Sequence, residues 1–215
     1  MTTSNAATLP HATRSLFATA AILCFAYSVL ALLLMHVLRP DLAPASSMIS
    51  DYAVGHYGWV MATVFFVWGV GCLMLLLGLI RAGLRSGIAR LGATMLGLVS
   101  LCTVNAFFQT DLPDAPETRS GFIHGIVFLV AMASFILATL LLGIGFGRDS
   151  RWRSYRSTAL TLALLNVGAV VLQFLTLHRG MPYGLVNRFI FAMMMAWFIA
   201  TAIRLRAVPR DSSAS

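Results

Sequence analysis

The sequence predicts an all-α fold, an integral membrane bundle of six transmembrane helices with both termini in the cytoplasm. Three observations predict it: an apolar composition, six long apolar runs and an uneven distribution of arginine. Of the 215 residues, 59% are hydrophobic and only 10% are charged, and the mean hydropathy is +0.86. Because this balance lies far from that of a soluble domain, we expect the chain to reside in a membrane.

Each of the six apolar runs is predicted to form one spanning helix. A helix needs about 20 mostly apolar residues to cross about 30 Å of hydrocarbon. No run shows the strict alternation of a membrane β-strand, so helices are the only spanning structure left. The predicted helices cover residues 15–38, 59–80, 91–108, 121–146, 157–177 and 185–203. Residues 15–206 would form the transmembrane domain, with cytoplasmic tails at 1–14 and 207–215.

The distribution of arginine sets the predicted orientation. All 15 basic residues are arginine, and 11 of them fall on the side of the topology that carries both termini. Since positive residues near helix ends are held on the cytoplasmic side, we expect a multi-pass protein of the bacterial inner membrane with cytoplasmic termini. The net charge of +8 then reflects contacts with anionic lipid headgroups. No nucleic-acid partner is expected, because the arginines form no stripe interleaved with exposed aromatic residues.

Unusual polar residues gather at the end of the bundle that this orientation places outside the cytoplasm. Five of the seven acidic residues fall there, together with a histidine and an arginine that each lie about one turn inside a helix. Ionisable residues within a membrane indicate a functional site by default, although structural ion pairs produce the same pattern. The candidate ligand-binding residues of this polar cluster are Ser50, Asp51, Asp111, His124, Asn187 and Arg188.

Two contacts are predicted within this polar cluster. Arg188, near the start of the sixth helix, could extend to the headgroups, but we favour an ion pair, because an unpaired acid is poorly tolerated beside lipid. Asp111, at the end of the third helix, is favoured over Asp51 as its partner. Gly121 and Gly125 form a GxxxG pair that brackets His124. This pair predicts a close approach between the fourth helix and a neighbour at the depth of the histidine.

Other polar residues have a structural interpretation. Asp114 followed by Glu117 is a capping-box arrangement in type, and Pro116 suits the first turn of the fourth helix. The cysteines lie inside apolar runs without CxxC spacing, so we expect them to pack between helices as small apolar residues. They are Cys24, Cys72 and Cys102.

Four short motifs are shared with a known family. They are MISDYAVGHYGW before the second helix, FFQTD closing the third, GFIHG opening the fourth and GLVNRF opening the sixth. In this order, over residues 15–206, the chain resembles a bacterial membrane-protein family filed as domain of unknown function 998. The resemblance implies a six-helix membrane protein with Ser50, Asp111, His124 and Arg188 at motif positions. Asn187 stands where we expect a glutamine, and the family name implies no activity.

The polar cluster is compatible with three classes of function. The first is binding or transport of a small or lipid-derived ligand, in which Arg188 would hold an anionic group while His124 and Ser50 orient it. Binding is favoured over transport because the sequence shows no inverted halves and no broken helix at mid-membrane. The alternatives are a membrane-embedded hydrolase acting on lipid or envelope substrates, and a structural scaffold without a ligand.

The hydrolase alternative has two possible sites. Ser50, His124 and Asp111 are the residue types of a catalytic triad, but no nucleophile elbow accompanies them. His56, His124 and His178 with Asp111 could supply zinc ligands, but no HxxxH spacing is present, and haem would need histidines that face each other within the bundle. We therefore expect no metal or other cofactor, and membrane lipids as partners. Enzymatic activity and oligomeric state stay open.

Overall fold

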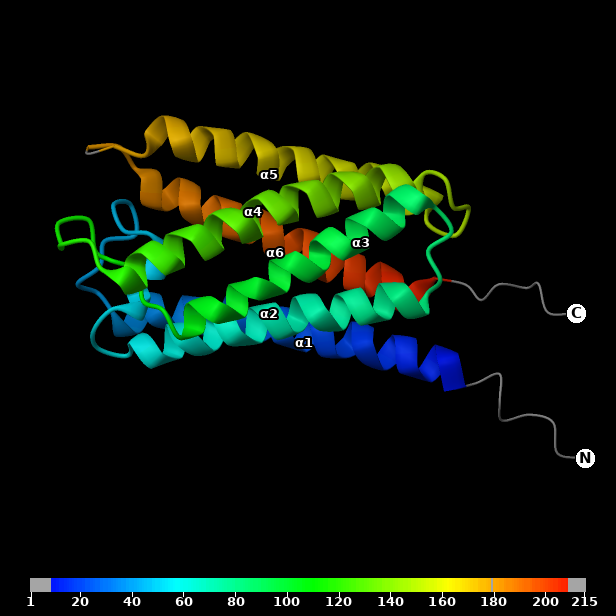
Figure 1. Cartoon of the computed structure of the whole chain (residues 1–215), viewed down its shortest axis with the longest axis horizontal. Coiled ribbons are helices and arrows are strands. Elements are labelled where there is room, and N and C mark those ends of the chain that lie inside the picture. The colour runs from blue at the N-terminus through cyan, green and yellow to red at the C-terminus, as the bar shows by residue number, and fades with distance from the viewer. Residues whose placement is uncertain (1–8, 179, 209–215) are drawn as a thin grey trace, which may run out of the picture.

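The helices run back and forth along one axis, so that α1 begins and α6 ends at the same end of the molecule (Figure 1). We refer to this end as the terminal end and to the opposite one as the distal end. The computed structural model describes residues 9–178 and 180–208, and these ranges contain helices and no strand. The long helices are α1 Leu9–Leu38, α2 Gly58–Arg81, α3 Gly87–Val99, α4 Arg119–Phe146, α5 Arg156–Thr176 and α6 Tyr183–Ala207. Short 3-10 helices lie between them, η1 Ile49–Ala53, η2 Ser100–Ala106 and η3 Arg153–Tyr155.

The structure confirms the predicted fold class. Six helical segments are long and apolar enough to cross a membrane. The first helix begins earlier than predicted, at Leu9. Most of the two predicted tails, residues 1–8 and 209–215, falls outside the described residues. The direction in which the bundle crosses the membrane stays a prediction.

The third span changes its helix type before it reaches the distal end. The α-helix ends at Val99, and the chain continues as the 3-10 helix η2. Within η2 the hydroxyls of Ser100 and Thr103 donate hydrogen bonds to carbonyls three residues earlier, at 2.5 and 2.9 Å. Such local bonds compete with the α-helical pattern and favour the tighter turn. Gly69 of α2 packs against this segment, where a Cβ atom would meet Thr103.

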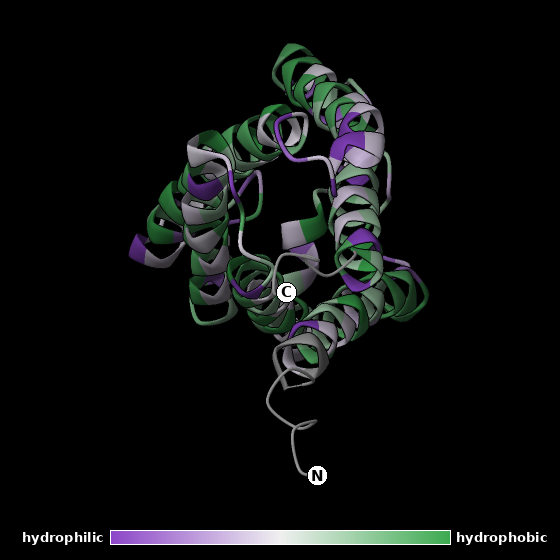
Figure 2. Ribbon diagram, turned by 90° about the vertical axis from the view of Figure 1, so that its right-hand side faces the viewer, coloured by the Kyte–Doolittle hydropathy of each residue, from purple (hydrophilic) through white to green (hydrophobic). Residues whose placement is uncertain are grey.

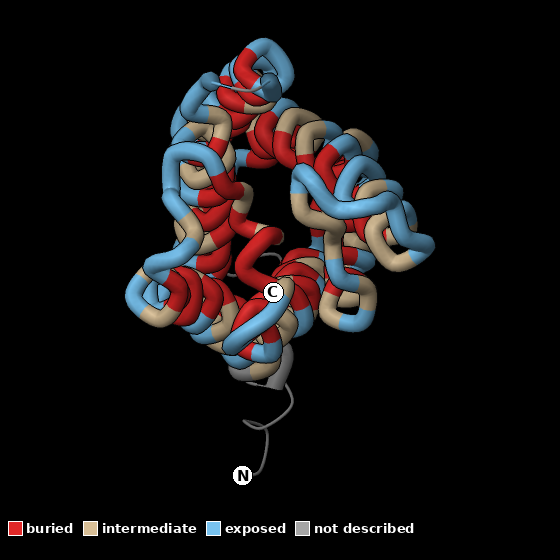
Figure 3. The backbone as a smooth tube through the Cα atoms, turned by 90° about the vertical axis from the view of Figure 1, so that its left-hand side faces the viewer, coloured by how far each residue is buried: buried red, intermediate tan, exposed pale blue. Residues whose placement is uncertain are grey.

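The six helices form a closed ring. Each helix contacts its neighbours in chain order, and α6 returns to contact α1 (Figure 2). Seen from the distal end, the buried stretches face the inside of this ring (Figure 3). Aromatic side chains fill its centre, where Phe25 stacks on Phe198 at 4.6 Å between ring centroids and Phe135 contacts Phe198 at 5.1 Å. The apolar side chains on the outside then face lipid.

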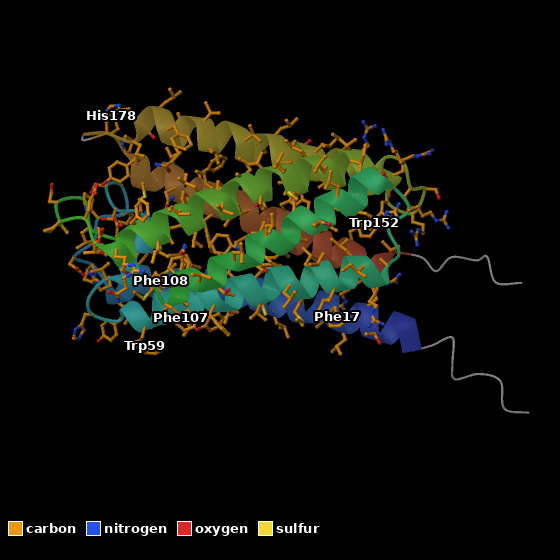
Figure 4. The ribbon with its side chains drawn as sticks, in the orientation of Figure 1. Phe17, Trp59, Phe107, Phe108, Trp152 and His178 are labelled. Carbon is orange, nitrogen blue, oxygen red and sulfur yellow. The ribbon has the colours of Figure 1, made fainter. Side chains whose placement is uncertain are left out.

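Helices α4 and α5 meet closely at the terminal end and diverge toward the distal end (Figure 1). Near the terminal end a Cβ atom on Gly143 of α4 would meet the Leu160 side chain of α5 at 2.6 Å, so the two helices lie close together here. At the same end of the molecule, Trp152 is fully buried and stacks on Phe146 with ring centroids 4.5 Å apart (Figure 4). The terminal end is therefore filled by rings, whereas α4 and α5 lie farther apart at the distal end.

Candidate functional site

A cavity of about 350 Å³ lies in the distal half of the ring, bordered by α2, α4, α5, α6, η1 and the third span. We call it the distal pocket. Its volume is typical of a small-ligand site, and most of its wall is apolar. Among the described residues that border it there is no acid and no arginine. The side chains with hydrogen-bonding N or O atoms in its wall are Ser50, Trp68, Asn105, Thr110, His124, Gln173 and Asn187.

His124 reaches the distal pocket from the first turns of α4. Its Nδ1 lies 2.9 Å from the carbonyl oxygen of Phe108, which Figure 4 shows at the distal end. Because a carbonyl can only accept, Nδ1 carries the proton and Nε2 of the neutral ring is left as an acceptor. The edge of the ring packs against Phe65 at 5.7 Å between centroids. His124 is therefore held in one orientation and one tautomer, and within the described chain no hydrogen bond uses Nε2.

Buried amides leave polar atoms unpaired at the same pocket. Gln173 of α5 is only 7% exposed, and neither its Nε2 nor its Oε1 has a hydrogen-bond partner in the described part of the chain. The Oδ1 of Asn105 is buried and unpaired in the same way. A buried polar atom without a partner costs about 1–3 kcal/mol. Native structures usually satisfy such atoms with water or a ligand, so these amides indicate a site for one.

Asn187 has a divided role at the start of α6. Its Oδ1 accepts a hydrogen bond from the backbone N–H of Ile49 at 2.9 Å, which fixes η1 against α6. Since this bond identifies the oxygen, the remaining amide nitrogen is a donor on a side chain that borders the distal pocket. Asn187 therefore holds the loop and offers a donor to the pocket.

Arg188 lies in a set of contacts that we call the Arg188 clasp, which joins α6 to α1 and to the loop before η1. Its Nε donates to His36 Nε2 at 2.8 Å, and Nη2 donates to the Tyr52 hydroxyl at 3.0 Å. Its Nη1 donates to the carbonyls of Ser47 and Gly184 at 2.7 and 3.0 Å. The guanidinium also lies over the Tyr52 ring, 5.5 Å from its centroid. Four of the five guanidinium N–H donors are thus used within the protein.

The predicted ion pair between Asp111 and Arg188 is wrong. Asp111 instead accepts two hydrogen bonds from Thr118, from its N–H and its hydroxyl, both at 2.8 Å. The ring order explains the difference, because α6 packs between α5 and α1 while Asp111 lies just before α4. A sequence does not specify which helices become neighbours, so matched depth alone could not identify the partner.

The start of α4 also differs from the prediction. The N-cap residue is Thr118, whose hydroxyl accepts a hydrogen bond from the N–H of Gly121 at 3.0 Å. The predicted capping box of Asp114 and Glu117 is therefore wrong, since both residues precede the cap. The predicted close approach at the GxxxG pair is found at Gly121 and not at Gly125. A Cβ atom on Gly121 would meet the Asp111 carboxylate, and one on Gly125 would meet nothing within 4 Å.

Asp51 faces a different cavity from its neighbour Ser50. It borders a shallow cleft of about 830 Å³ on the distal surface, together with Tyr183 and residues of the connecting loops. Its Oδ2 accepts a hydrogen bond from the Met48 N–H at 2.7 Å. Burial raises the pKa of the Asp51 carboxyl, against smaller lowering by this N–H and by the charge of Arg188. The 3-10 helix η1 thus separates the surface cleft from the distal pocket.

The structure brings together only part of the predicted polar cluster. Ser50, His124 and Asn187 border the distal pocket, whereas Asp51, Asp111 and Arg188 do not. The described residues show no hydrogen bond between Ser50 and His124, so a nucleophile and base pair is not assembled. Within the same ranges no group of three or more His, Cys, Asp or Glu side chains could hold a metal ion.

Two residues of the pocket were not predicted from the sequence. Asn105 and Gln173 are uncharged amides inside apolar runs, so a prediction based on ionisable residues does not include them. A usable signal was present on α5, because Asn166 and Gln173 are seven residues apart and so fall on one helix face. Both are buried. Uncharged polar residues within a span therefore merit the same attention as charged ones.

Comparison with known proteins identifies the family. The family model described as "Protein of unknown function (DUF998)" matches residues 7–204, which is nearly the whole chain. The chain therefore belongs to this family, as the order of its four motifs predicted. No curated protein and no solved structure matches the chain. The family description assigns no activity, so the function must be argued from the site.

Proposed function

We propose that this member of the family binds an uncharged amphiphilic ligand in the distal pocket. The observation that carries the proposal is the pair of unpaired amides, Gln173 and Asn105, buried in an otherwise apolar cavity. An apolar pocket with a few convergent polar groups is the usual form of a small-molecule site. A ligand with an apolar body and a small polar head would cover the wall and pair these atoms.

The free polar atoms of the pocket favour a head group that both donates and accepts. Gln173 Nε2 and the Asn187 amide nitrogen are donors, while Gln173 Oε1, Asn105 Oδ1 and His124 Nε2 are acceptors. Hydroxyl and carbonyl groups match this set. A charged head group does not, because the wall offers no opposite charge and burying an unpaired ion costs several kcal/mol. We therefore propose an uncharged ligand, in place of the anionic group that Arg188 was expected to hold.

We also propose that the protein lies in the bacterial inner membrane with its terminal end in the cytoplasm. Arginines support this orientation, since they cluster in the connections at the terminal end, such as those around Arg81, Arg148 and Arg156, and near the end of α6 at Arg204. The distal pocket would then lie in the half of the bilayer that faces away from the cytoplasm. In a cysteine-free background, single cysteines introduced at Ser120 and at the exposed Ser46 should react with an impermeant reagent from outside intact cells.

Three ten-carbon amphiphiles test the proposed ligand class. Decanol, decanoate and decylamine share a chain and differ in head-group charge at neutral pH. We expect decanol to raise the melting temperature of the purified protein. At a concentration 100 times its Kd, the ligand should add about 2.7 kcal/mol to the free energy of unfolding. This corresponds to about 5–10 °C for a chain of this size. Equal shifts from all three compounds, or a larger shift from either ion, would contradict the proposal.

A further inference from the structure

We propose that the ligand is a glycerolipid with an uncharged head group, a diacylglycerol, which enters the distal pocket sideways from the bilayer between α4 and α5. The inference rests on the proposed function and adds to it the source and class of the ligand. Its basis is that the hydrogen-bonded segment η1 borders the pocket on one side and exposed apolar side chains of α4 and α5 border it on another.

The water-facing side of the distal pocket is closed by η1. Asn187 fixes the N-terminal residue of η1, Ile49, through its backbone N–H at 2.9 Å. Gln109 fixes the last residue, Ala53, by donating to its carbonyl oxygen at 3.1 Å. The Arg188 clasp holds the loop that leads into η1. Hydrogen bonds thus hold both ends of η1 and the loop before it, so that η1 covers the pocket. A ligand from the aqueous side would have to break these bonds.

The lipid-facing side is open where α4 and α5 diverge. The two helices touch at Gly143 and Leu160 near the terminal end and separate toward the distal end (Figure 1). Between them, a Cβ atom on Gly125 of α4 would meet nothing within 4 Å. Two apolar side chains border the pocket and are exposed on its outer side, Leu129 of α4 at 56% and Phe174 of α5 at 63%. The opening is therefore lined by side chains that prefer lipid to water.

The volume of the pocket limits what part of a lipid it encloses. A water-sized group occupies about 30 Å³, so a volume of about 350 Å³ holds about 12 such groups. That is the glycerol and ester region of a diacylglycerol, without the rest of its acyl chains. The chains would leave through the opening between α4 and α5 and remain in the bilayer.

The head group of a diacylglycerol matches the free atoms of the pocket. Its hydroxyl can donate to His124 Nε2 or to Asn105 Oδ1, and its two ester carbonyls can accept from Gln173 Nε2 and the Asn187 amide nitrogen. A phospholipid has the same glycerol and esters but adds a phosphate. No described arginine borders the pocket to pair with that phosphate, and four of the five donors of Arg188 are used in the clasp.

Photo-crosslinking in proteoliposomes tests this inference. The probe is a diacylglycerol with a diazirine on one acyl chain close to the ester, and the matched probe is a phosphatidylglycerol with the same chains. We expect the first probe to label peptides 125–132 of α4 and 170–177 of α5 at least ten times more than the second. Unlabelled dioleoylglycerol should compete for this labelling.

A pair of glycine substitutions controls for the route. Gly125→Leu fills the opening and should reduce labelling of these peptides about tenfold. Gly168→Leu introduces the same side chain at an exposed glycine of α5 that also has open space but does not border the pocket, and it should leave labelling unchanged. Equal labelling by the two lipids would overturn the lipid class, and labelling insensitive to Gly125→Leu would overturn the route. If decanol stabilises the protein but no diacylglycerol labelling occurs, this inference fails while the proposed function stands; if decanol has no effect, the proposed function fails first.

Discussion

Two polar regions at the distal end of the bundle differ in whether their hydrogen-bonding groups have partners within the protein. In the Arg188 clasp, the guanidinium donates to His36, to the Tyr52 hydroxyl and to two carbonyls. In the distal pocket, Gln173 and Asn105 are buried with three atoms that no described residue satisfies. Arg188 uses four of its five donors, whereas neither side-chain polar atom of Gln173 has a partner among the described residues. The charged residue Arg188 therefore belongs to a structural contact, whereas the neutral amides lie at the candidate binding site.

The difference follows from what each group costs when it is left unpaired. An ion without partners in an apolar interior costs several kcal/mol, so the fold must surround it with donors or acceptors. An unpaired amide atom costs about 1–3 kcal/mol, which a protein of ordinary stability can tolerate. A ligand can then recover that cost on binding. The buried charge of Arg188 therefore indicates a structural contact between helices.

The largest predicted effect is loss of the Arg188 clasp. Arg188→Leu removes four hydrogen bonds and leaves the Ser47 carbonyl and the Tyr52 hydroxyl without their donor. We expect a loss of about 3 kcal/mol or more, because bonds from a charged donor contribute about 1.5–3 kcal/mol each. The melting temperature in detergent should fall by about 6–12 °C.

A control variant separates shape from charge in the clasp. Arg188→Lys keeps the charge but loses the planar fork of donors, so it should recover only a minor part of the stability. Combining Arg188→Gln with Asp111→Asn should give additive losses, since no bond joins the two residues. A double variant that loses clearly less than the sum would restore the ion pair that the structure replaces.

Asp51 provides a smaller effect that depends on pH. Burial raises the pKa of its carboxyl in the folded state. The folded protein therefore binds this proton more tightly than the unfolded chain does. Stability from this group is highest below the unfolded pKa of about 3.9, falls as the pH rises through the folded pKa, and is constant above it.

Replacing this carboxylate should accordingly stabilise the protein at neutral pH. Asn in place of Asp51 can still accept from the Met48 N–H, and it carries no buried charge. We expect Asp51→Asn to raise the melting temperature at neutral pH by about 2 °C, with the gain vanishing in acid. Melting curves across this range check it. A loss at neutral pH would mean that the Asp51 charge contributes to the Arg188 clasp.

The fold could be predicted from the sequence because length and composition determine a spanning helix. Six apolar runs gave six helices, and the main local difference was the 3-10 turn of η2, where Ser100 and Thr103 form short-range bonds. The family followed from four motifs. These features depend on residues close together in the chain.

The site was harder to predict because it depends on which helices become neighbours. His124, Ser50 and Asn187 were identified, since a polar residue near a helix end is visible in the sequence. The partner of Arg188 was not, because His36 lies 152 positions away and only the ring order brings it close. Gln173 was missed because an uncharged residue in an apolar run changes its hydropathy little.

The central claim is that the clasp serves stability and the distal pocket serves binding, and one set of melting curves tests it most directly. Gln173→Leu should melt at or above the wild-type temperature without ligand, since it removes two unpaired polar atoms, and should lose the decanol shift. Arg188→Gln should melt lower and keep that shift. The account would be contradicted if Gln173→Leu were less stable than wild type yet retained the full shift, or if Arg188→Gln abolished it.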